Sequence, residues 1–195
     1  TAAGIAVPEH RVVAGPDEVD AALCEAVGSA EAIVKIVSPQ ILHKSDVGGV
    51  RVARNEPGAL REAVASVLAA SRREVADADL RGVLVARKIA FRGGLGREIL
   101  AGFRHDRAFG PVLFAGAGGL DAEYLLRLIA PGKASVTRST SGLDFDAAVA
   151  AVRGTVFHDA LCGELRSARR TGVPEAVLAR LLLSLGALAD IFAGF

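Results

Sequence analysis

The chain has 195 residues, which is enough for one moderate domain or for two lobes that share a cleft. Hydrophobic residues make up 51% of it and aromatic residues only 5%, so the core is built from Ala, Val, Leu and Ile, which suits an α/β protein. The formal net charge of +1 gives no reason to expect binding to nucleic acid or to an anionic membrane. Cys24 and Cys162 are too few for a disulfide framework or a zinc site, and we expect both to be small buried hydrophobic residues.

The termini and the apolar runs bear on completeness and location. The chain begins at Thr1 without Met and stops at Phe195, so we expect a fragment of a longer protein. No apolar run approaches the length of a membrane span, and no charged-then-apolar signal peptide opens the chain. The expected location is the cytoplasm.

The first half of the chain alternates between strand-like and helix-like patterns. One helix is expected to start at Pro16 and to end at Gly28, because proline favours a first helical turn and glycine a C-cap. A second helix is expected to start within Asn55–Pro57, and Ser71–Asp79 is expected to be charged and solvated. Strands are expected where apolar and β-branched residues cluster, at Arg11–Ala14, Ala32–Val37, Val50–Ala53 and Leu80–Ala90.

One stretch, Lys35–Val50, carries unusual chemistry for its place in the chain. Lys35 lies in an apolar strand, where the period of two puts it on one face with Ile33 and Val37. An unpaired buried ammonium group is costly, so we expect an anion near Lys35. The strand is followed by a polar loop around His43, which ends in two glycines.

The second half begins at a cluster of glycines. Residues 93–96 contain three of them and predict a hinge, which divides the chain into an N-terminal lobe of residues 1–92 and a C-terminal lobe of residues 93–195. Two strands follow, Arg97–Arg104 and Pro111–Ala115, and the short link between them predicts an antiparallel pair.

The last third of the chain is expected to be mostly helical. Residues 131–142 are polar and are expected to form a loop before the helices begin. The expected helices cover residues 144–152, 155–169 and 174–192.

Two features of the second half suit phosphate or metal binding. The glycine-rich Gly116–Gly119 follows a strand directly, but it lacks the lysine of a P-loop and the third glycine of a dinucleotide fingerprint, so a tight turn explains it equally well. Glu98 and Glu123 are separated by the predicted hairpin, and two carboxylates with a lysine suit a Mg-nucleotide site. The alternative for each glutamate is an ordinary surface position.

The four histidines show no metal-ligand spacing. Three of them, His10, His105 and His158, are most simply surface or cap residues. His43 differs because Asp46 follows it on the same loop and is close enough in sequence to orient the imidazole as a nucleophile. The alternative is a loop histidine that is hydrogen-bonded to the backbone.

Four segments of the chain, taken in order, are informative together. They are Gly4–Pro8, Val34–Val50, Gly96–Pro111, and Gly116–Gly119 with Glu123. Together they resemble the ATP-grasp domain of NDP-forming acyl-CoA synthetases, which are relatives of the succinyl-CoA synthetase β subunit. The resemblance covers residues 4–131 well and implies an α/β (α+β) ATP-grasp fold, in which two lobes with mixed or antiparallel sheets and flanking helices close on Mg-ATP.

The resemblance also implies a function and a set of site residues. The family makes acyl-CoA from an acid, CoA and ATP, or runs the reverse, through acyl phosphate and phosphohistidine. It implies binding of ATP or ADP with Mg, and of CoA through a partner domain or subunit of the same enzyme, with oligomerisation left open. By position, His43 with Asp46 would relay the phosphoryl group and Glu123 would lie near the metal. The residues that would bind the nucleotide are Lys35, Lys44, Glu98, Gly118 and Gly119.

The chain departs from the family pattern at several points. Ala86–Lys88 stands where the family has a Gln-Glu-Met-like segment that contacts adenine, and Arg127 replaces an acidic residue. The Glu-x-Asp-x-Asn-Pro metal motif and the CoA-binding domain are absent from these residues, so this chain alone is not expected to complete the synthetase cycle. The alternative is a degenerate regulatory module that binds nucleotide or acyl-CoA weakly, as in some protein lysine acetyltransferases. Arg87 and Arg127 favour it, because a reversed charge changes nucleotide and metal contacts.

Overall fold

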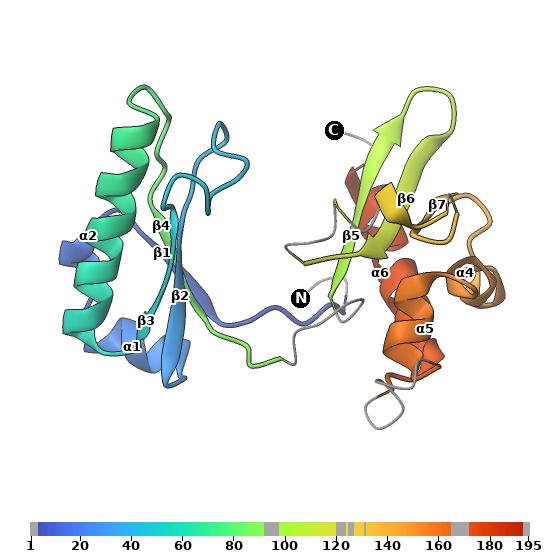
Figure 1. Ribbon diagram of the computed structural model, residues 1–195, viewed down its shortest axis with the longest axis horizontal. Coiled ribbons are helices and arrows are strands. Elements are labelled where there is room, and N and C mark those ends of the chain that lie inside the picture. Colours follow the sequence, from blue (N-terminus) through green and yellow to red (C-terminus); the bar gives the residue numbers. More distant parts are fainter. Residues whose placement is uncertain are drawn as a thin grey trace. The chain divides into compact units, whose positions relative to one another are not determined.

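The computed structural model describes residues 4–91, 98–119, 124, 127–130, 132–164 and 172–192. Its contacts divide the chain into two compact units. The N-terminal unit is Val7–Ala90, and the C-terminal unit is Phe91–Phe195 together with Thr1–Ala6. Each unit contains an antiparallel sheet with helices packed against it (Figure 1). None of the helices within the described ranges is long and apolar enough to cross a membrane.

The N-terminal unit is a four-stranded antiparallel sheet in the order β1-β4-β2-β3. Its strands are β1 (His10–Val13), β2 (Glu31–Ile36), β3 (Val50–Arg54) and β4 (Val83–Arg87). A 3-10 turn, η1 (Pro16–Glu18), and two helices, α1 (Ala21–Val27) and α2 (Pro57–Glu74), complete it. Apolar side chains from the helices and from one face of the sheet form a single core, with Val34, Val85 and Val64 among its fully buried members.

The alternation along β2 shows which face of this sheet is covered. Val34 and Ile36 are fully buried beneath the helices, whereas Ile33 and Lys35 are half-buried and belong to the opposite, open face. This confirms the predicted separation of the two faces, because successive side chains of a strand point to opposite sides of the sheet.

The start of α1 differs from the prediction. An α-helix was expected from Pro16, but Pro16–Glu18 form only the 3-10 turn, and α1 begins after Asp20. The carboxylate of Asp20 accepts a hydrogen bond of 2.8 Å from the backbone N–H of Leu23, which satisfies a donor that the first turn of a helix leaves free. Gly28 ends the helix with a φ of 63°, as predicted.

The end of α2 also differs from the prediction. The helix continues through Glu74, and Ser71, which was expected to be solvated, is fully buried. The polar residues around it hide the helical period, because only Ser71 of that turn faces the core.

The C-terminal unit is a three-stranded antiparallel sheet in the order β5-β6-β7. Its strands are β5 (Ile99–Asp106), β6 (Gly110–Ala117) and β7 (Ser135–Ser139), and its helices are α4 (Phe145–Val152), α5 (Val156–Cys162) and α6 (Glu175–Phe192). Leu113 and Ala115 of β6 pack with Phe157 of α5 and Leu182 of α6 in the second core. The hairpin of β5 and β6 confirms the predicted antiparallel pair.

Strand β7 was predicted to be a loop, and this was wrong. All five of its residues pair with β6, from Ser135 opposite Gly116 to Ser139 opposite Val112. Its other edge pairs with no strand among the described residues, and only Val136 packs against the core, so the polar sequence carries no apolar alternation. Helix α5 is also shorter than expected, because Gly163 ends it in the left-handed conformation with a φ of 89°.

Candidate functional site

The loop between β2 and β3 presents His43 to solvent. The backbone of the loop folds on itself: Gly49 N–H donates to Lys44 O at 2.7 Å and Asp46 N–H donates to His43 O at 3.2 Å. The Lys44 ammonium group donates to Ile41 O at 3.3 Å. This lysine, which was predicted to bind the nucleotide, therefore points back onto its own loop. The loop is therefore a defined structure with an exposed imidazole.

Two apolar side chains attach this loop to the core of the N-terminal unit. Ile41 is 4% exposed and Val47 is half-buried, and both pack into the core. His43 lies between them in sequence and is exposed. The only hydrogen bond between His43 and Asp46 within the described ranges joins backbone atoms, so the predicted orientation of the imidazole by Asp46 stays a prediction.

Lys35 lies on the open face of the N-terminal sheet. Its partners in register are Val50 on β3 and Leu84 on β4, so its surroundings on this face are largely apolar. Its ammonium group makes no hydrogen bond or ion pair with any residue in the part of the chain that the structure describes. A half-buried cation in this situation is available to an anion, and the anion that the sequence leads us to expect there stays a prediction.

Arg87 does not face this open surface. Its guanidinium group donates to Val27 O at 3.1 Å and to Gly28 O at 3.0 Å, and it pairs with the Glu9 carboxylate at 3.0 Å. It therefore caps the C-terminus of α1, where a cation is favoured. Its charge is used on the helix-covered side of the sheet, which weakens the expectation that Arg87 alters nucleotide contacts.

The open face of the C-terminal sheet forms a second candidate surface. A shallow hollow of about 520 Å³ lies there, lined by Leu100, Ala101, Gly102, Phe103, Arg104, Val112, Phe114 and Thr137. Its lining is mainly apolar, and the opposite face of the same sheet is covered by α4, α5 and α6. Such a surface suits a flat, partly apolar ligand.

Glu98 and the glycine loop meet at the end of this sheet. Gly118 N–H donates to Glu98 O at 2.7 Å, and a Cβ at Gly119 would lie 3.0 Å from the Glu98 carboxylate oxygen Oε1. Gly118 is equally restricted, since a Cβ there would lie 2.9 Å from the backbone nitrogen of Leu100. The structure thus brings together three predicted nucleotide-binding residues, while Glu123 lies outside the described residues.

The predicted site residues fall into two groups. Lys35, His43, Lys44 and Asp46 belong to the N-terminal unit, whereas Glu98 and the two glycines belong to the C-terminal unit. Each group is held by its own sheet and the loops that adjoin it.

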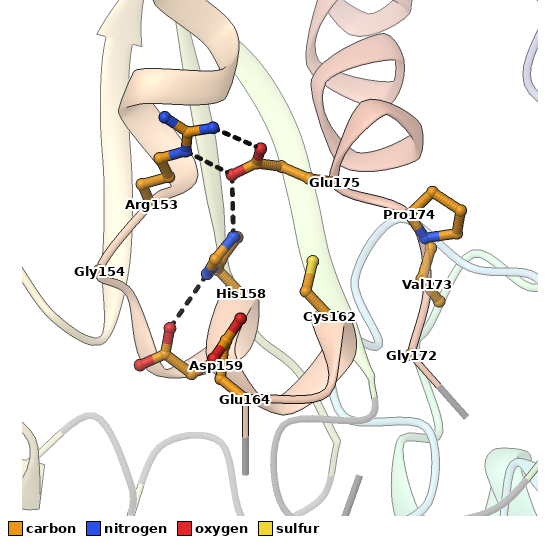
Figure 2. Close-up of a pocket in the computed structure, with 10 residues that line it drawn as sticks. All are labelled: Arg153, Gly154, His158, Asp159, Cys162, Glu164, Gly172, Val173, Pro174 and Glu175. Carbon is orange, nitrogen blue, oxygen red and sulfur yellow. Dashed lines mark hydrogen bonds and ion pairs between the residues drawn. The ribbon is translucent and has the colours of Figure 1, made fainter. Parts of the chain in front are cut away.

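A polar cluster that the sequence did not reveal lines a pocket of about 780 Å³ in the C-terminal unit (Figure 2). His158 was expected at the surface or in a cap, but it is 8% exposed. Its Nδ1 lies 3.0 Å from Asp159 Oδ1 and its Nε2 lies 3.0 Å from Glu175 Oε1. Arg153 donates two hydrogen bonds to Glu175, of 2.7 and 2.8 Å. Because 17 residues separate His158 from Glu175, no local sequence pattern announces the pair.

This cluster connects helices more readily than it catalyses a reaction. Both ring nitrogens of His158 are engaged by carboxylates, so neither is free to move a proton for a substrate. Burial, with a smaller contribution from Glu175, raises the pKa of the Cys162 thiol, which keeps it protonated and weakly nucleophilic. No group of three or more His, Cys, Asp or Glu suited to a metal ion occurs among the described residues.

The cluster predicts a dependence of stability on pH. The Arg153 guanidinium, with a smaller contribution from His158, lowers the pKa of Glu175 below the ordinary value of 4.5 for a glutamate. A carboxyl group whose pKa is lowered by folding stabilises the folded chain above its unfolded pKa, and that stability is lost as the pH falls through the folded pKa. We expect Glu175→Gln to lower the free energy of unfolding at pH 7, and the deficit to shrink as the pH falls below about 4.5.

Urea unfolding between neutral and acidic pH measures this difference. Glu164→Gln is the matched control, because Glu164 lines the same pocket, is exposed, and has no ion pair within the described ranges. Equal pH dependence in Glu175→Gln and in the parent chain would contradict the prediction.

The comparisons with known proteins bear on both units. A family model described as an ATP-grasp domain matches residues 1–190. The chain belongs to the ATP-grasp family. The predicted ATP-grasp fold is thereby confirmed, and the two sheets with their helices are the framework of this ATP-grasp domain.

The relatives of this ATP-grasp domain are acyl-CoA ligases. It is 38% identical, over 122 residues, to the β subunit of ADP-forming acetate–CoA ligase I of Pyrococcus furiosus. It is 34% identical, over 93 residues, to the ADP-forming 4-hydroxybutyrate–CoA ligase of Nitrosopumilus maritimus. The predicted resemblance to NDP-forming acyl-CoA synthetases is confirmed.

A solved structure supports the same relationship. The ATP-grasp domain superimposes with a TM-score of 0.78, at 27% identity, on acetyl-coenzyme A synthetase 1 of Ca. Korarchaeum cryptofilum in complex with coenzyme A, Ca-AMPCP and HgCl+. That match covers 97% of this chain and 76% of the solved one. The sequence matches cover 63% and 48% of this chain, but only 50% of the Pyrococcus subunit and 13% of the Nitrosopumilus ligase.

Proposed function

We propose that this ATP-grasp domain binds Mg-ATP and transfers its γ-phosphoryl group to His43, as one part of an ADP-forming acyl-CoA synthetase. The observation that carries the proposal is the loop of His43, which is anchored in the core yet exposes the imidazole. The similarity to ADP-forming acyl-CoA ligases supports it.

Two sets of residues would contact the phosphates of the nucleotide. Lys35 and Lys44 belong to the N-terminal unit, and Glu98, Gly118 and Gly119 belong to the C-terminal unit. The free ammonium group of Lys35 and the close approach of Gly119 to the Glu98 carboxylate fit this role. Magnesium would arrive with the nucleotide and neutralise phosphate charge, and Glu123 is the residue we propose beside it.

The chemical step uses His43 as the nucleophile. A lone pair of the neutral imidazole forms an N–P bond with the γ-phosphorus, while the bond from that phosphorus to the bridging oxygen breaks and its electron pair leaves with ADP. Transfer of the phosphoryl group to the acid, and of the acyl group to CoA, would take place on a partner domain or subunit. The named relatives act on acetate and on 4-hydroxybutyrate, so the acid itself is not assigned. A cytoplasmic location is part of the proposal.

Arg87 and Arg127 were the two residues that favoured the regulatory alternative. The argument from Arg87 is weakened, because Arg87 caps α1 and does not face the open side of the sheet. Arg127 is exposed, and its reversed charge is the remaining argument for this alternative. A chain that fails to bind nucleotide would favour this alternative.

Calorimetry with Mg-ATP tests the proposed binding. We expect the full chain to bind, and Lys35→Ala to bind about 10-fold or more weakly, because a charge-assisted contact contributes roughly 1.5–3 kcal/mol. Lys133→Ala removes an exposed lysine from the same chain and should bind as the parent does. The absence of any heat of binding up to millimolar ATP would overturn the proposed function. Equal affinities of Lys35→Ala and Lys133→Ala for Mg-ATP would show that Lys35 does not contact the nucleotide.

A further inference from the structure

The loop of His43 rests on helix α2, and its two glycines, Gly48 and Gly49, lie against the small residues Ala70 and Ser71. We propose that Ala70 and Ser71 of α2 are positioning residues for His43: their small side chains set how closely the loop approaches the helix, and so where the imidazole stands. The inference rests on the proposed function for its catalytic consequence, but the packing itself is independent of that function.

Gly48 brings the loop against Ala70. Its φ is +65°, and a Cβ added there would lie 3.0 Å from the Ala70 Cβ, which is closer than ordinary van der Waals contact. A larger side chain at position 70 that points toward Gly48 would therefore meet the backbone of the loop from the other side.

Gly49, the next residue of the loop, lies against the interior of the N-terminal unit. A Cβ there would lie 2.7 Å from Ile36 Cγ2, 2.8 Å from Lys44 O and 3.3 Å from the hydroxyl of Ser71. Gly49 also closes the base of the loop, since its carbonyl accepts the N–H of Ile36 at 2.8 Å. The loop backbone is thus enclosed by β2, by its own turn and by α2.

Ser71 shows that size, and not hydrogen bonding, is what this position supplies. The residue is fully buried, and its hydroxyl has no hydrogen-bond partner among the residues that the structure describes. An unpaired buried hydroxyl lowers stability, so Ser71 is unfavourable as a polar group. The hydroxyl does lie beside Gly49, 3.3 Å from where a Cβ of that residue would stand, so a side chain that extended further toward the loop would meet its backbone.

The position of His43 depends on this contact more than on its own side chain. The imidazole is exposed and makes no hydrogen bond or ion pair with the part of the chain that the structure describes. Only the backbone of the loop therefore places the imidazole, and a displacement of about 1 Å can reduce a reaction rate by roughly 100-fold.

A pair of matched variants in the full chain tests the inference. Ala70→Val enlarges the side chain that faces Gly48, whereas Ala69→Val makes the same change at the neighbouring exposed position of the same helix. We expect Ala70→Val to slow the labelling of His43 by γ-labelled Mg-ATP about 10-fold or more. Its affinity for Mg-ATP should stay within about twofold of the parent, and Ala69→Val should label at the parent rate.

Amide hydrogen exchange gives a second readout that needs no phosphoryl transfer. The amides of Gly49 and Ile36 should exchange faster in Ala70→Val than in Ala69→Val, because both take part in closing the loop. If Mg-ATP does not label His43 in the parent chain, the proposed function is wrong. Amide hydrogen exchange would still test the packing of the loop against α2 in that case. Equal exchange and equal labelling in the two valine variants would overturn the inference. Should Ala70→Val fail to fold, Ala70→Ser applies the same test with one added atom.

Discussion

Replacing His43 by alanine is expected to reduce acid-labile phosphoryl labelling of the chain by γ-labelled Mg-ATP by more than about 100-fold, to background. The imidazole is the group that would form the N–P bond, and alanine provides no nucleophile in its place. Because His43 is exposed and its side chain makes no hydrogen bond or ion pair within the described residues, the stability of the fold should change by no more than about 0.5 kcal/mol. The measurement is labelling of the full chain, followed by tests of the stability of the label in acid and in base.

The control for this experiment is a second exposed histidine in the same unit. His10 lies on β1, and His10→Ala should label at the parent rate. Equal labelling of His43→Ala and of the parent chain would show that His43 is not the phosphoryl acceptor. Loss of label in both variants would point to a damaged fold instead, which thermal unfolding of each variant would reveal.

Replacing Phe157 by alanine is expected to have the largest effect on stability. The side chain is 1% exposed and lies at the centre of the second core, between β6 and the C-terminal helices. Removal of a buried phenylalanine side chain costs about 3–5 kcal/mol, because the lost apolar burial is followed by a cavity that relaxes only in part. A domain of ordinary stability would approach unfolding, since total stabilities are only about 5–15 kcal/mol.

Urea unfolding followed by far-ultraviolet circular dichroism measures this loss. Phe109→Ala is the matched control, because Phe109 is 73% exposed in the link between β5 and β6. Its free energy of unfolding should stay within about 0.5 kcal/mol of the parent value. A loss below about 1 kcal/mol for Phe157→Ala would show that the second core is not packed as described.

Much of the fold follows from local patterns in the sequence. The period of two in β2 separates the buried Val34 and Ile36 from Lys35, and Gly28 marks the end of α1. The short link at Gly110 is enough to predict the hairpin of β5 and β6. These features depend on residues that are close in sequence, which is why a pattern can reveal them.

The features that the sequence did not reveal depend on distant partners. Strand β7 is polar and becomes a strand only because β6 provides a row of backbone donors and acceptors. His158 is buried by Glu175 and the surrounding helices, and nothing near it in sequence announces that. The charge of Arg87 suggested a changed nucleotide site. The direction of its side chain is fixed by α1 and by Glu9, which are more than 50 residues away in the chain, so no local pattern reveals it.

The pairing of β1 with β4 has a consequence for how the chain folds. The C-terminal unit is discontinuous, since Thr1–Ala6 belongs to it, and Ile5 packs against its core across an insertion that spans Val7–Ala90. Bringing two ends together across a long flexible segment costs conformational entropy that grows with the logarithm of the length. When β1 pairs with β4, Arg87 N–H donates to Glu9 O at 2.8 Å, so both ends of the insertion meet within the N-terminal unit. The folded insertion then acts as a short covalent link, and Ile5 reaches its core as if the 84 intervening residues were only a few.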